Sequence, residues 1–381
     1  MLMAPAGAKA NNRFAFDLHA HLAAASPGEN ICFSPFSISA ALAMLHAGAR
    51  GDTAAEIAVV LRADPSTKIE PARLQDASGK PLPSQPLPFR MANALWAHDG
   101  YPIRADYATL LRDRHDAEIR SVDFIHDAEP TRRIINDWVS RKTSGLISDL
   151  LTDPLHPLTR LILTNAVYFQ AKWLTPFDRD LTQRQPFHLE SGSTADVALM
   201  HRRLYGRYAE GHGYRTAAVE YENRARMWIV LPDEGRSLAE VEAALSADDL
   251  MATWSAAERR QEVYLWLPKF RVRARCELAQ TLAALGMPAA FTDTADFSGM
   301  HEPSPRPLVL SDVIHEAFTD VNEERTVAAA ATATLMRAGA GAYDPSNPVE
   351  FRCDRPFLFF IRDAMPGAIL FMGRLTDPTK D

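Results

Sequence analysis

The chain has 381 residues and a formal net charge of -7 at pH 7, with 47% hydrophobic and 23% charged residues. This composition is typical of a globular protein, and its acidic balance does not favour a nucleic acid or another polyanion as a partner. The N-terminus lacks a basic stretch followed by an apolar one, and no run of 18 apolar residues occurs, so we expect neither an export signal nor a transmembrane helix.

Length alone suggests two or three domains. The three cysteines, Cys32, Cys276 and Cys353, lie far apart and form no CxxC motif. We therefore expect three buried reduced thiols, no zinc or redox motif and no other metal site.

The first part of the chain is predicted to be largely helical. Apolar residues at helical spacing indicate helices over residues 12–25 and 37–49, and Asp52 is predicted to cap a third helix. Prolines concentrated between 65 and 88 indicate an irregular surface segment. Another amphipathic helix is expected over 131–142, with Ile134, Ile135 and Trp138 facing inward.

Strands dominate the later part. Residues 159–170 are predicted to form a central strand buried on both faces. Further strands are expected over 227–231, 262–273, 308–322, 357–361 and 369–375, and a helix over 276–285. Helices early and strands late indicate an α+β fold.

Patterns typical of enzymes are absent. The sequence has no GxSxG, HExxH or Walker motif, and Gly339-Ala340-Gly341 lacks the rest of a dinucleotide fingerprint. We therefore expect no catalytic activity and no cofactor.

The segment 326–334, TVAAAATAT, contains only small or β-tolerant residues. Such a segment can enter between two packed strands without a steric clash. A flexible linker is the alternative interpretation of this segment taken by itself.

Several separate motifs resemble those of the serpin family. They occur in the family's order and cover residues 12–376. The motifs are NICFSPFSIS at 30–39, NAVYFQAKW at 165–173, LPKF at 267–270, ADFSGM at 295–300, SDVIHEAF at 311–318, RPFLF at 355–359 and Gly373-Arg374.

The resemblance implies one serpin domain over 1–381, with three β-sheets and eight or nine helices, which replaces the length-based expectation. It also implies a metastable fold whose exposed reactive loop, about 325–350, is cut by a serine protease. The cut loop would then insert as an additional central strand and trap the acyl-enzyme.

The family's hinge maps onto nine consecutive residues. They are Glu323, Glu324, Arg325, Thr326, Val327, Ala328, Ala329, Ala330 and Ala331. Alternation along a strand would place Thr326 and every second residue after it on the inner face. Arg325 stands where inhibitory serpins usually carry glycine, which favours a non-inhibitory member or slower insertion.

Two polar groups are also carried over from the family. The shutter maps onto Ser34, Ser37, Asn165 and His315. The breach maps onto Trp173, Lys269 and Glu323, with an ion pair expected between Lys269 and Glu323. Ordinary satisfaction of buried polar groups, and a solvent-exposed Glu323, remain the alternatives.

The resemblance places the cleaved bond at Gly339–Ala340, with Arg337 and Ala338 as alternates. A small residue before the bond favours an elastase- or subtilisin-like target, whereas Arg337–Ala338 would suit a trypsin-like one. We expect a monomer without a polyanion cofactor. The family favours an extracellular location, and the missing export signal leaves the cytoplasm open. A non-inhibitory chaperone or carrier is the alternative function.

Overall fold

The computed structural model describes residues 5–63, 89–223, 225–257, 260–324, 348–363 and 367–380. Its contacts fall into two compact units. The first comprises Met1–Leu18, Phe33–Tyr168 and Ala274–Phe318, and the second comprises His19–Cys32, Phe169–Arg273 and Thr319–Asp381. The single domain over 1–381 stays a prediction.

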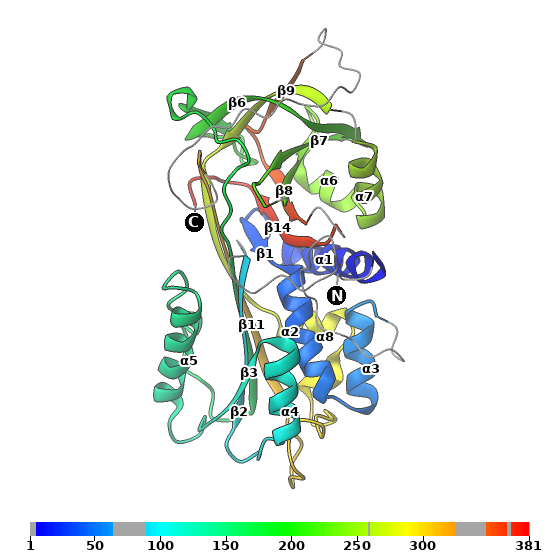
Figure 1. Ribbon diagram of the computed structural model, residues 1–381, viewed down its shortest axis with the longest axis vertical. Helices are drawn as coiled ribbons and strands as arrows, with labels where there is room; N and C mark the ends of the chain where they lie inside the picture. Colours follow the sequence, from blue (N-terminus) through cyan, green and yellow to red (C-terminus); the bar gives the residue numbers. More distant parts are fainter. Residues whose placement is uncertain are drawn as a thin grey trace. The chain divides into compact units, whose positions relative to one another are not determined.

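Eight α-helices lie within the described ranges (Figure 1). They are α1 (Pro5–Ala25), α2 (Pro35–Gly48), α3 (Gly51–Val60), α4 (Ala105–Leu110), α5 (Ala128–Lys142), α6 (Leu238–Ala244), α7 (Ala247–Ala256) and α8 (Ala279–Leu285). Three short helical turns add to these: a π-helical turn at Leu111–His115, and 3-10 turns at Arg179–Leu181 and Pro288–Phe291.

Two details of the helix predictions are wrong. α3 begins at Gly51, so Asp52 lies in its first turn and is not its cap. There its carboxylate still favours the helix through the positive end of the helix dipole. In α5, Ile134 is 47% exposed while Ile135 and Trp138 are buried. Ile135, Trp138 and Val139 follow the spacing of one helix face, and Ile134 lies about 100° away from it.

A five-stranded sheet, most of which belongs to the first unit, has the order β10-β11-β4-β2-β3. The strands are β2 (Phe89–His98), β3 (Glu118–Val122), β4 (Leu161–Phe169), β10 (Phe270–Glu277) and β11 (Leu310–Val321). β4 is buried along its whole length, as predicted. The single strand predicted over 262–273 is instead two, β9 (Arg260–Pro268) and β10, with Lys269 between them.

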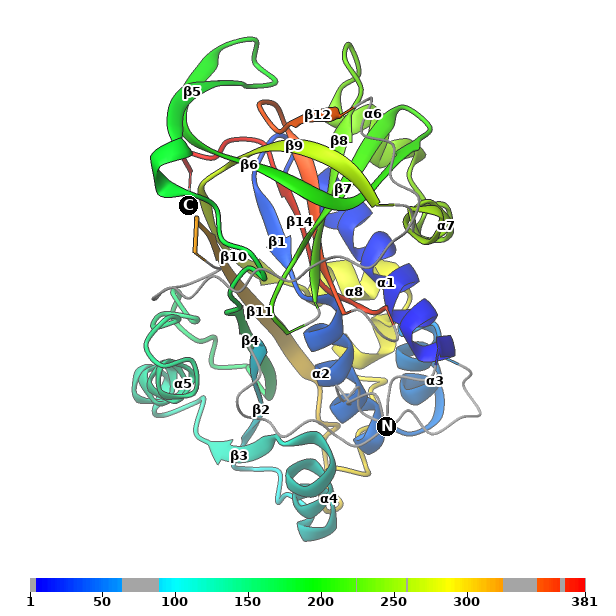
Figure 2. The same cartoon turned by 45° about the horizontal axis from the view of Figure 1, so that its top comes forward.

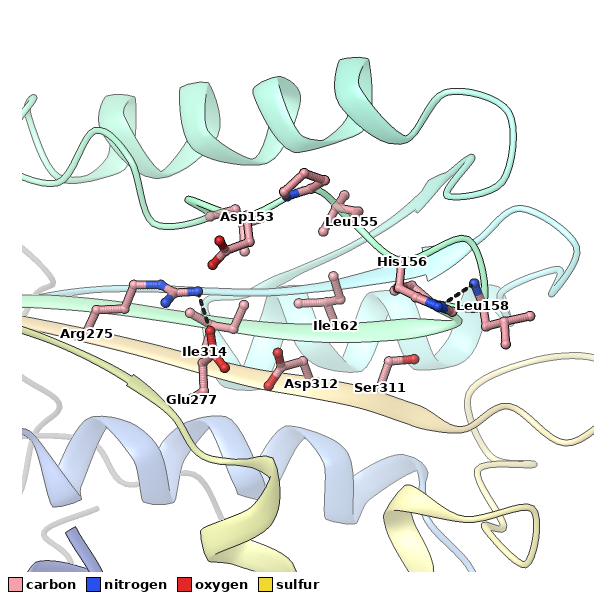
Figure 3. Close-up of a pocket in the computed structure, with 13 residues that line it drawn as sticks. Asp153, Leu155, His156, Leu158, Ile162, Arg275, Glu277, Ser311, Asp312 and Ile314 are labelled. Atoms are coloured by element: carbon pink, nitrogen blue, oxygen red, sulfur yellow. Dashed lines mark hydrogen bonds and ion pairs between the residues drawn. The ribbon is translucent and has the colours of Figure 1, made fainter. Parts of the chain in front are cut away.

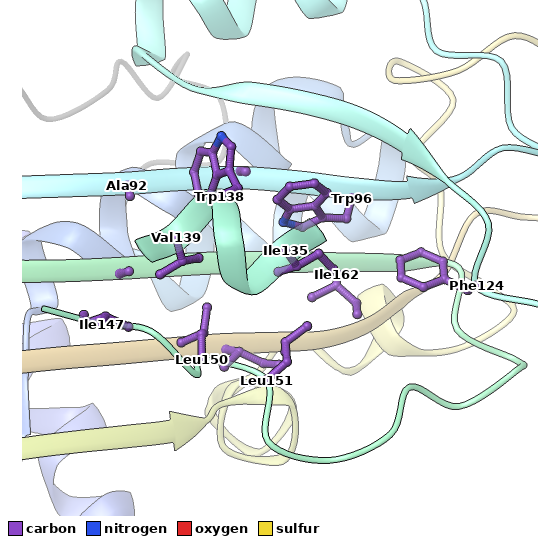
Figure 4. Packing of buried hydrophobic residues seen from close by; sticks show 13 residues of the cluster. Ala92, Trp96, Phe124, Ile135, Trp138, Val139, Ile147, Leu150, Leu151 and Ile162 are labelled. Atoms are coloured by element: carbon purple, nitrogen blue, oxygen red, sulfur yellow. The ribbon is translucent and has the colours of Figure 1, made fainter. Parts of the chain in front are cut away.

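Helix α5 packs on this sheet through an apolar cluster (Figure 4). Ile135, Trp138 and Val139 of α5 belong to the same buried cluster as Ile162 of β4 and Ile314 of β11. Trp138 meets Trp96 of β2 edge to face, with ring centroids 5.6 Å apart. One helix layer therefore covers β2, β4 and β11 together.

A nine-stranded set, nearly all of which belongs to the second unit, has the order β1-β14-β13-β8-β7-β6-β9-β12, and β5 also pairs with β6 (Figure 2). The strands are β1 (Ile31–Phe33), β5 (Gln183–His188), β6 (Thr194–Gly211), β7 (Tyr214–Glu220), β8 (Arg226–Pro232), β12 (Val349–Arg352), β13 (Phe357–Arg362), β14 (Ile369–Leu375) and β9. β6 pairs with β9 over residues 199–207 and with β7 over 208–211. This one strand therefore belongs to two sheets, which accounts for the expected three.

All three cysteines are free thiols. Cys32 and Cys353 are buried as expected, whereas Cys276 is partly exposed. Among the described helices, none combines the length and apolarity needed to cross a bilayer.

Candidate functional site

The seam between β4 and β11 is the first part of the candidate site. These strands are parallel and pair directly, from Leu161 opposite Leu310 to Tyr168 opposite Phe318. No strand separates them over this range. Asn165 and His315 lie opposite each other near the middle of the seam.

The four predicted shutter residues form one buried hydrogen-bonded group in the first unit. Asn165 Oδ1 lies 2.5 Å from His315 Nδ1, and its Nδ2 donates to Ser37 Oγ at 2.6 Å. The Ser34 amide donates to His315 Nε2 at 3.1 Å, and the Ser34 hydroxyl caps α2 by accepting from the Ser37 amide. Asn93 of β2 joins the group by accepting from Asn165 Nδ2.

These contacts determine the protonation of His315. Because the Ser34 amide can only donate, Nε2 must be the acceptor, and the ring proton lies on Nδ1 and points to Asn165 Oδ1. Burial lowers the pKa of His315 to about 3, which the hydrogen bond with Asn165 offsets only in part. The imidazole is therefore neutral at physiological pH, and its bond to Asn165 crosses the β4–β11 seam.

A cavity of about 600 Å³ lies beside the start of the same seam (Figure 3). Its lining includes Ile162 of β4, Asp312 and Ile314 of β11, and the segment that links α5 to β4. Burial raises the pKa of the Asp312 carboxyl. Because of this cavity, side chains do not completely cover the start of the β4–β11 seam.

The second part of the candidate site lies in the second unit, where the chain leaves β11. Lys269 Nζ and Glu323 Oε2 are 2.9 Å apart, so the expected ion pair is present. The Glu323 side chain is 8% exposed and that of Lys269 is 41% exposed. Burial opposes ionisation of Glu323, but hydrogen bonds from Lys269, its own backbone amide and Thr182 outweigh burial and lower its pKa.

Hydrogen bonds to three consecutive backbone carbonyl groups hold the residues that precede the predicted loop. The side-chain nitrogen Nε1 of Trp173 donates to the Asn322 carbonyl at 2.8 Å. The Phe177 backbone amide donates to the Glu323 carbonyl at 2.8 Å, and the Trp173 backbone amide donates to the Glu324 carbonyl at 3.3 Å. The Trp173 ring is fully buried and stacks on Tyr221 with centroids 4.3 Å apart. The Trp173–Phe177 segment therefore holds the chain up to Glu324.

Sequence motifs did not reveal every participant. Asn93, Thr182 and Tyr221 contact the two groups but belong to none of the quoted motifs. Of these three residues, only Asn93 had a signal in the sequence that could have indicated its role, because it is a polar residue within a largely apolar strand. The hinge from Arg325 to Ala331 and the bond candidates Arg337, Ala338, Gly339 and Ala340 lie outside the described residues.

Comparison with known proteins identifies the family. The model of the family described as Serpin (serine protease inhibitor) matches residues 9–378. The chain belongs to the serpin family. Its α+β fold is the serpin fold, as the sequence predicted.

The similar proteins include both inhibitors and other serpins. The chain is 36% identical to the leukocyte elastase inhibitor of Bos taurus, over 97% of this chain and 98% of the relative. It is 39% identical to an uncharacterized serpin-like protein of Thermococcus kodakarensis, over 96% of this chain and 84% of the relative. Among solved structures, human thyroxine-binding globulin matches with a TM-score of 0.83 and 28% identity, over 98% of this chain and 99% of the globulin.

Proposed function

We propose that this serpin is a suicide-type inhibitor of serine proteases rather than an enzyme. The protease serine would attack the carbonyl carbon of a residue in the 325–350 loop and form an ester, and the new amine would leave with the C-terminal side of the cut. The N-terminal part of the loop would then enter between β4 and β11 as an antiparallel strand.

The directly paired parallel strands β4 and β11 carry this proposal. The chain leaves β11 after Val321 and enters the small-residue segment 326–334 two residues after Glu324. A strand that folds back from this point runs antiparallel to β11, and therefore also to β4. One parallel ladder would thus be replaced by two antiparallel ladders, which are slightly more stable per residue.

The energy gained by insertion is large enough to trap an intermediate. If each added ladder bond contributes about 1 kcal/mol, a strand of roughly 14 residues contributes on the order of 10 kcal/mol. The small inner-face residues, beginning with Thr326 and Ala328, limit the cost of overpacking.

Insertion also has identifiable costs in the first unit. Strands in a sheet lie about 4.8 Å apart, so an added strand must break the bond between His315 and Asn165. The α5 layer, whose cluster includes both Ile162 and Ile314, must shift as these residues separate. The cavity beside them provides room for that movement.

For the target, we favour an elastase- or subtilisin-like protease that cuts at Gly339–Ala340 or Ala338–Gly339. The similarity to a leukocyte elastase inhibitor supports a small residue before the bond. Cleavage at Arg337–Ala338 by a trypsin-like protease is the alternate.

A non-inhibitory carrier or chaperone is the second candidate function. Two observations favour it: Arg325 replaces the usual hinge glycine, and one similar structure is thyroxine-binding globulin in complex with thyroxine. This candidate predicts that the loop is cut as an ordinary substrate.

Incubation with elastase-, subtilisin- and trypsin-like enzymes, followed by a denaturing gel, tests the proposal. We expect a covalent complex near the summed masses with at least one enzyme, and mass spectrometry of the released peptide then identifies the bond. Cleaved product alone with every enzyme would favour the carrier or chaperone. The variant Arg325→Gly distinguishes slow insertion of the loop from no insertion at all. It should increase the fraction of protein in the covalent complex only if the loop inserts.

A further inference from the structure

Four side chains with metal-binding atoms lie in the first unit where β2 and β3 end. β2 and β3 are parallel, with His98 opposite Val122, so the residues that follow each strand emerge at the same edge. The Asp99 amide donates to the Val122 carbonyl at 3.0 Å and holds the two strand ends together. His98 and Asp99 come from one strand end, and Asp123 and His126 from the other.

The distances between these groups suit one ion. His98 Nδ1 lies 3.3 Å from Asp99 Oδ1, and His126 Nδ1 lies 2.9 Å from Asp123 Oδ2. One ligand atom from each of His98, Asp99 and Asp123 lies within 4.8 Å of the others. A tetrahedral zinc site with bonds of about 2.0–2.1 Å has ligand atoms roughly 3.3 Å apart. Small rotations of the His98, Asp99 and Asp123 side chains would bring these three ligand atoms to that spacing, and His126 would join them from its contact with Asp123 Oδ2.

His98 is the observation that points to a ligand. Its side chain is 12% exposed, and its Nδ1 atom is buried without a hydrogen-bond partner among the described residues. The nearby Asp99 carboxylate does not meet the geometry of a hydrogen bond. A buried nitrogen in this condition is costly, and a bound cation would satisfy it.

Backbone hydrogen bonds fix the orientation of the Asp123 carboxylate. Its Oδ1 atom accepts from the amides of Ile125 at 2.8 Å and His126 at 2.9 Å. Its Oδ2 atom remains directed at the His126 ring. Hydrogen bonds of this kind commonly orient ligating carboxylates.

We propose that His98, Asp99, Asp123 and His126 bind a divalent transition-metal ion of the zinc class. Two carboxylates and two imidazoles provide the nitrogen and oxygen donors that this class prefers, whereas Mg²⁺ and Ca²⁺ prefer oxygen donors alone. The sequence predicted no metal site. These four residues come from two separate segments, which only the parallel pairing of β2 and β3 brings together.

The site also has a regulatory consequence, which rests on the proposed function. The Thr131 hydroxyl of α5 donates to the Asp123 carbonyl at 2.9 Å, so a bound ion would tie the end of β2 to the start of α5. α5 must shift when a strand enters between β4 and β11. A bound ion should therefore slow insertion of the cleaved loop.

Binding is tested on the intact protein after treatment with a chelator. Titration with Zn²⁺ by calorimetry and with Co²⁺ by visible absorption should give one ion per chain, with the absorption of a tetrahedral cobalt site. We expect His98→Gln, Asp99→Asn and His126→Gln each to weaken affinity at least tenfold, and His212→Gln, an exposed histidine in the second unit, to leave it unchanged. Asp99 is 59% exposed, so its variant should fold even if His98→Gln does not.

Unchanged affinity in folded Asp99→Asn or His126→Gln protein, or no saturable binding in the unmodified chain, would overturn the site. The regulatory consequence has its own readout, the rate of covalent-complex formation with and without saturating Zn²⁺. Zinc binding without any change in that rate would overturn the regulatory consequence alone. Zinc binding with no covalent complex under any condition would contradict the proposed function and leave the metal site intact.

Discussion

At the scale of single residues, the shutter group shows how a hydrogen-bond network determines a charge state. His315 is fully buried; its Nε2 atom accepts a hydrogen bond from the Ser34 backbone amide, and its Nδ1 atom donates one to Asn165 Oδ1. Its folded pKa of about 3 lies below the ordinary value of 6.5. The unfolded chain therefore binds a proton that the folded chain does not bind between these two values.

This difference predicts a pH dependence of stability. The contribution of His315 is fully present above pH 6.5 and is lost as pH falls toward 3, at about 1.4 kcal/mol per pH unit. Nitrogen NMR, assigned through His315→Gln, should show the neutral Nδ1–H form unchanged between pH 7.5 and 5. Titration of this ring with a midpoint near 6.5 would contradict the hydrogen-bond assignment.

The ion pair of Lys269 and Glu323 supports a second prediction. Lys269→Met leaves the buried Glu323 carboxylate with Thr182 as its side-chain donor, and should reduce the free energy of unfolding by about 2 kcal/mol at pH 7. Because the folded pKa of Glu323 is lowered, the pair contributes above about pH 4.5 and is lost as pH falls through the folded pKa. The effect of Lys269→Met should accordingly shrink in acid.

Urea unfolding at pH 7 and pH 3.5 measures this difference. Arg271→Met is the matched control, because Arg271 pairs with Asp320 while its own side chain is 54% exposed, and its loss should cost less than about 1 kcal/mol. Equal effects of the two variants would show that burial of Glu323 adds nothing to its pair with Lys269.

At the scale of elements, the sequence predicted the buried strand β4 and the helix α5 because their apolar patterns are long and regular. It did not separate β9 from β10, although two signals of a break were present. The apolar alternation changes phase after Leu267 and resumes at Phe270, and Pro268 stands between the two runs. Asp52 matched the composition of a cap, but Gly51 supplies the positive φ of 53° at which the helix begins. Contacts such as that of Asn93 with Asn165 depend on which strands pair and in which register, and the sequence alone did not predict this.

Helix α5 offers a test with adjacent residues of one type. Ile135 is fully buried against the sheet, whereas its neighbour Ile134 is 47% exposed. Ile135→Ala should lower the free energy of unfolding by about 2–5 kcal/mol, and Ile134→Ala by less than about 1 kcal/mol. Chemical unfolding measures both, and similar losses would contradict the packing of α5 on β4 and β11.

At the scale of the whole molecule, the proposed mechanism needs an intact state that is less stable than the inserted one. β4 and β11 pair directly in the described structure, so the proposed insertion must first separate them, and the small residues of the hinge segment would limit the overpacking that follows. The sequence predicted the serpin fold from motifs distributed over nearly the whole chain, and the family match over residues 9–378 confirms it. The hinge and the cleaved bond stay predictions, because they lie outside the described residues.

Thermal unfolding before and after a single cut in the 325–350 loop tests the central claim most directly. A gain on the order of 10 kcal/mol should raise the midpoint by roughly 10 °C or more in the cut protein, because the unfolding entropy of a chain of this length is about 0.8 kcal/mol/K. Thr326→Arg places a charge on the predicted inner face and should abolish this rise while leaving the intact midpoint unchanged. An unmodified chain that unfolds at the same temperature before and after cleavage would contradict insertion of the loop between β4 and β11.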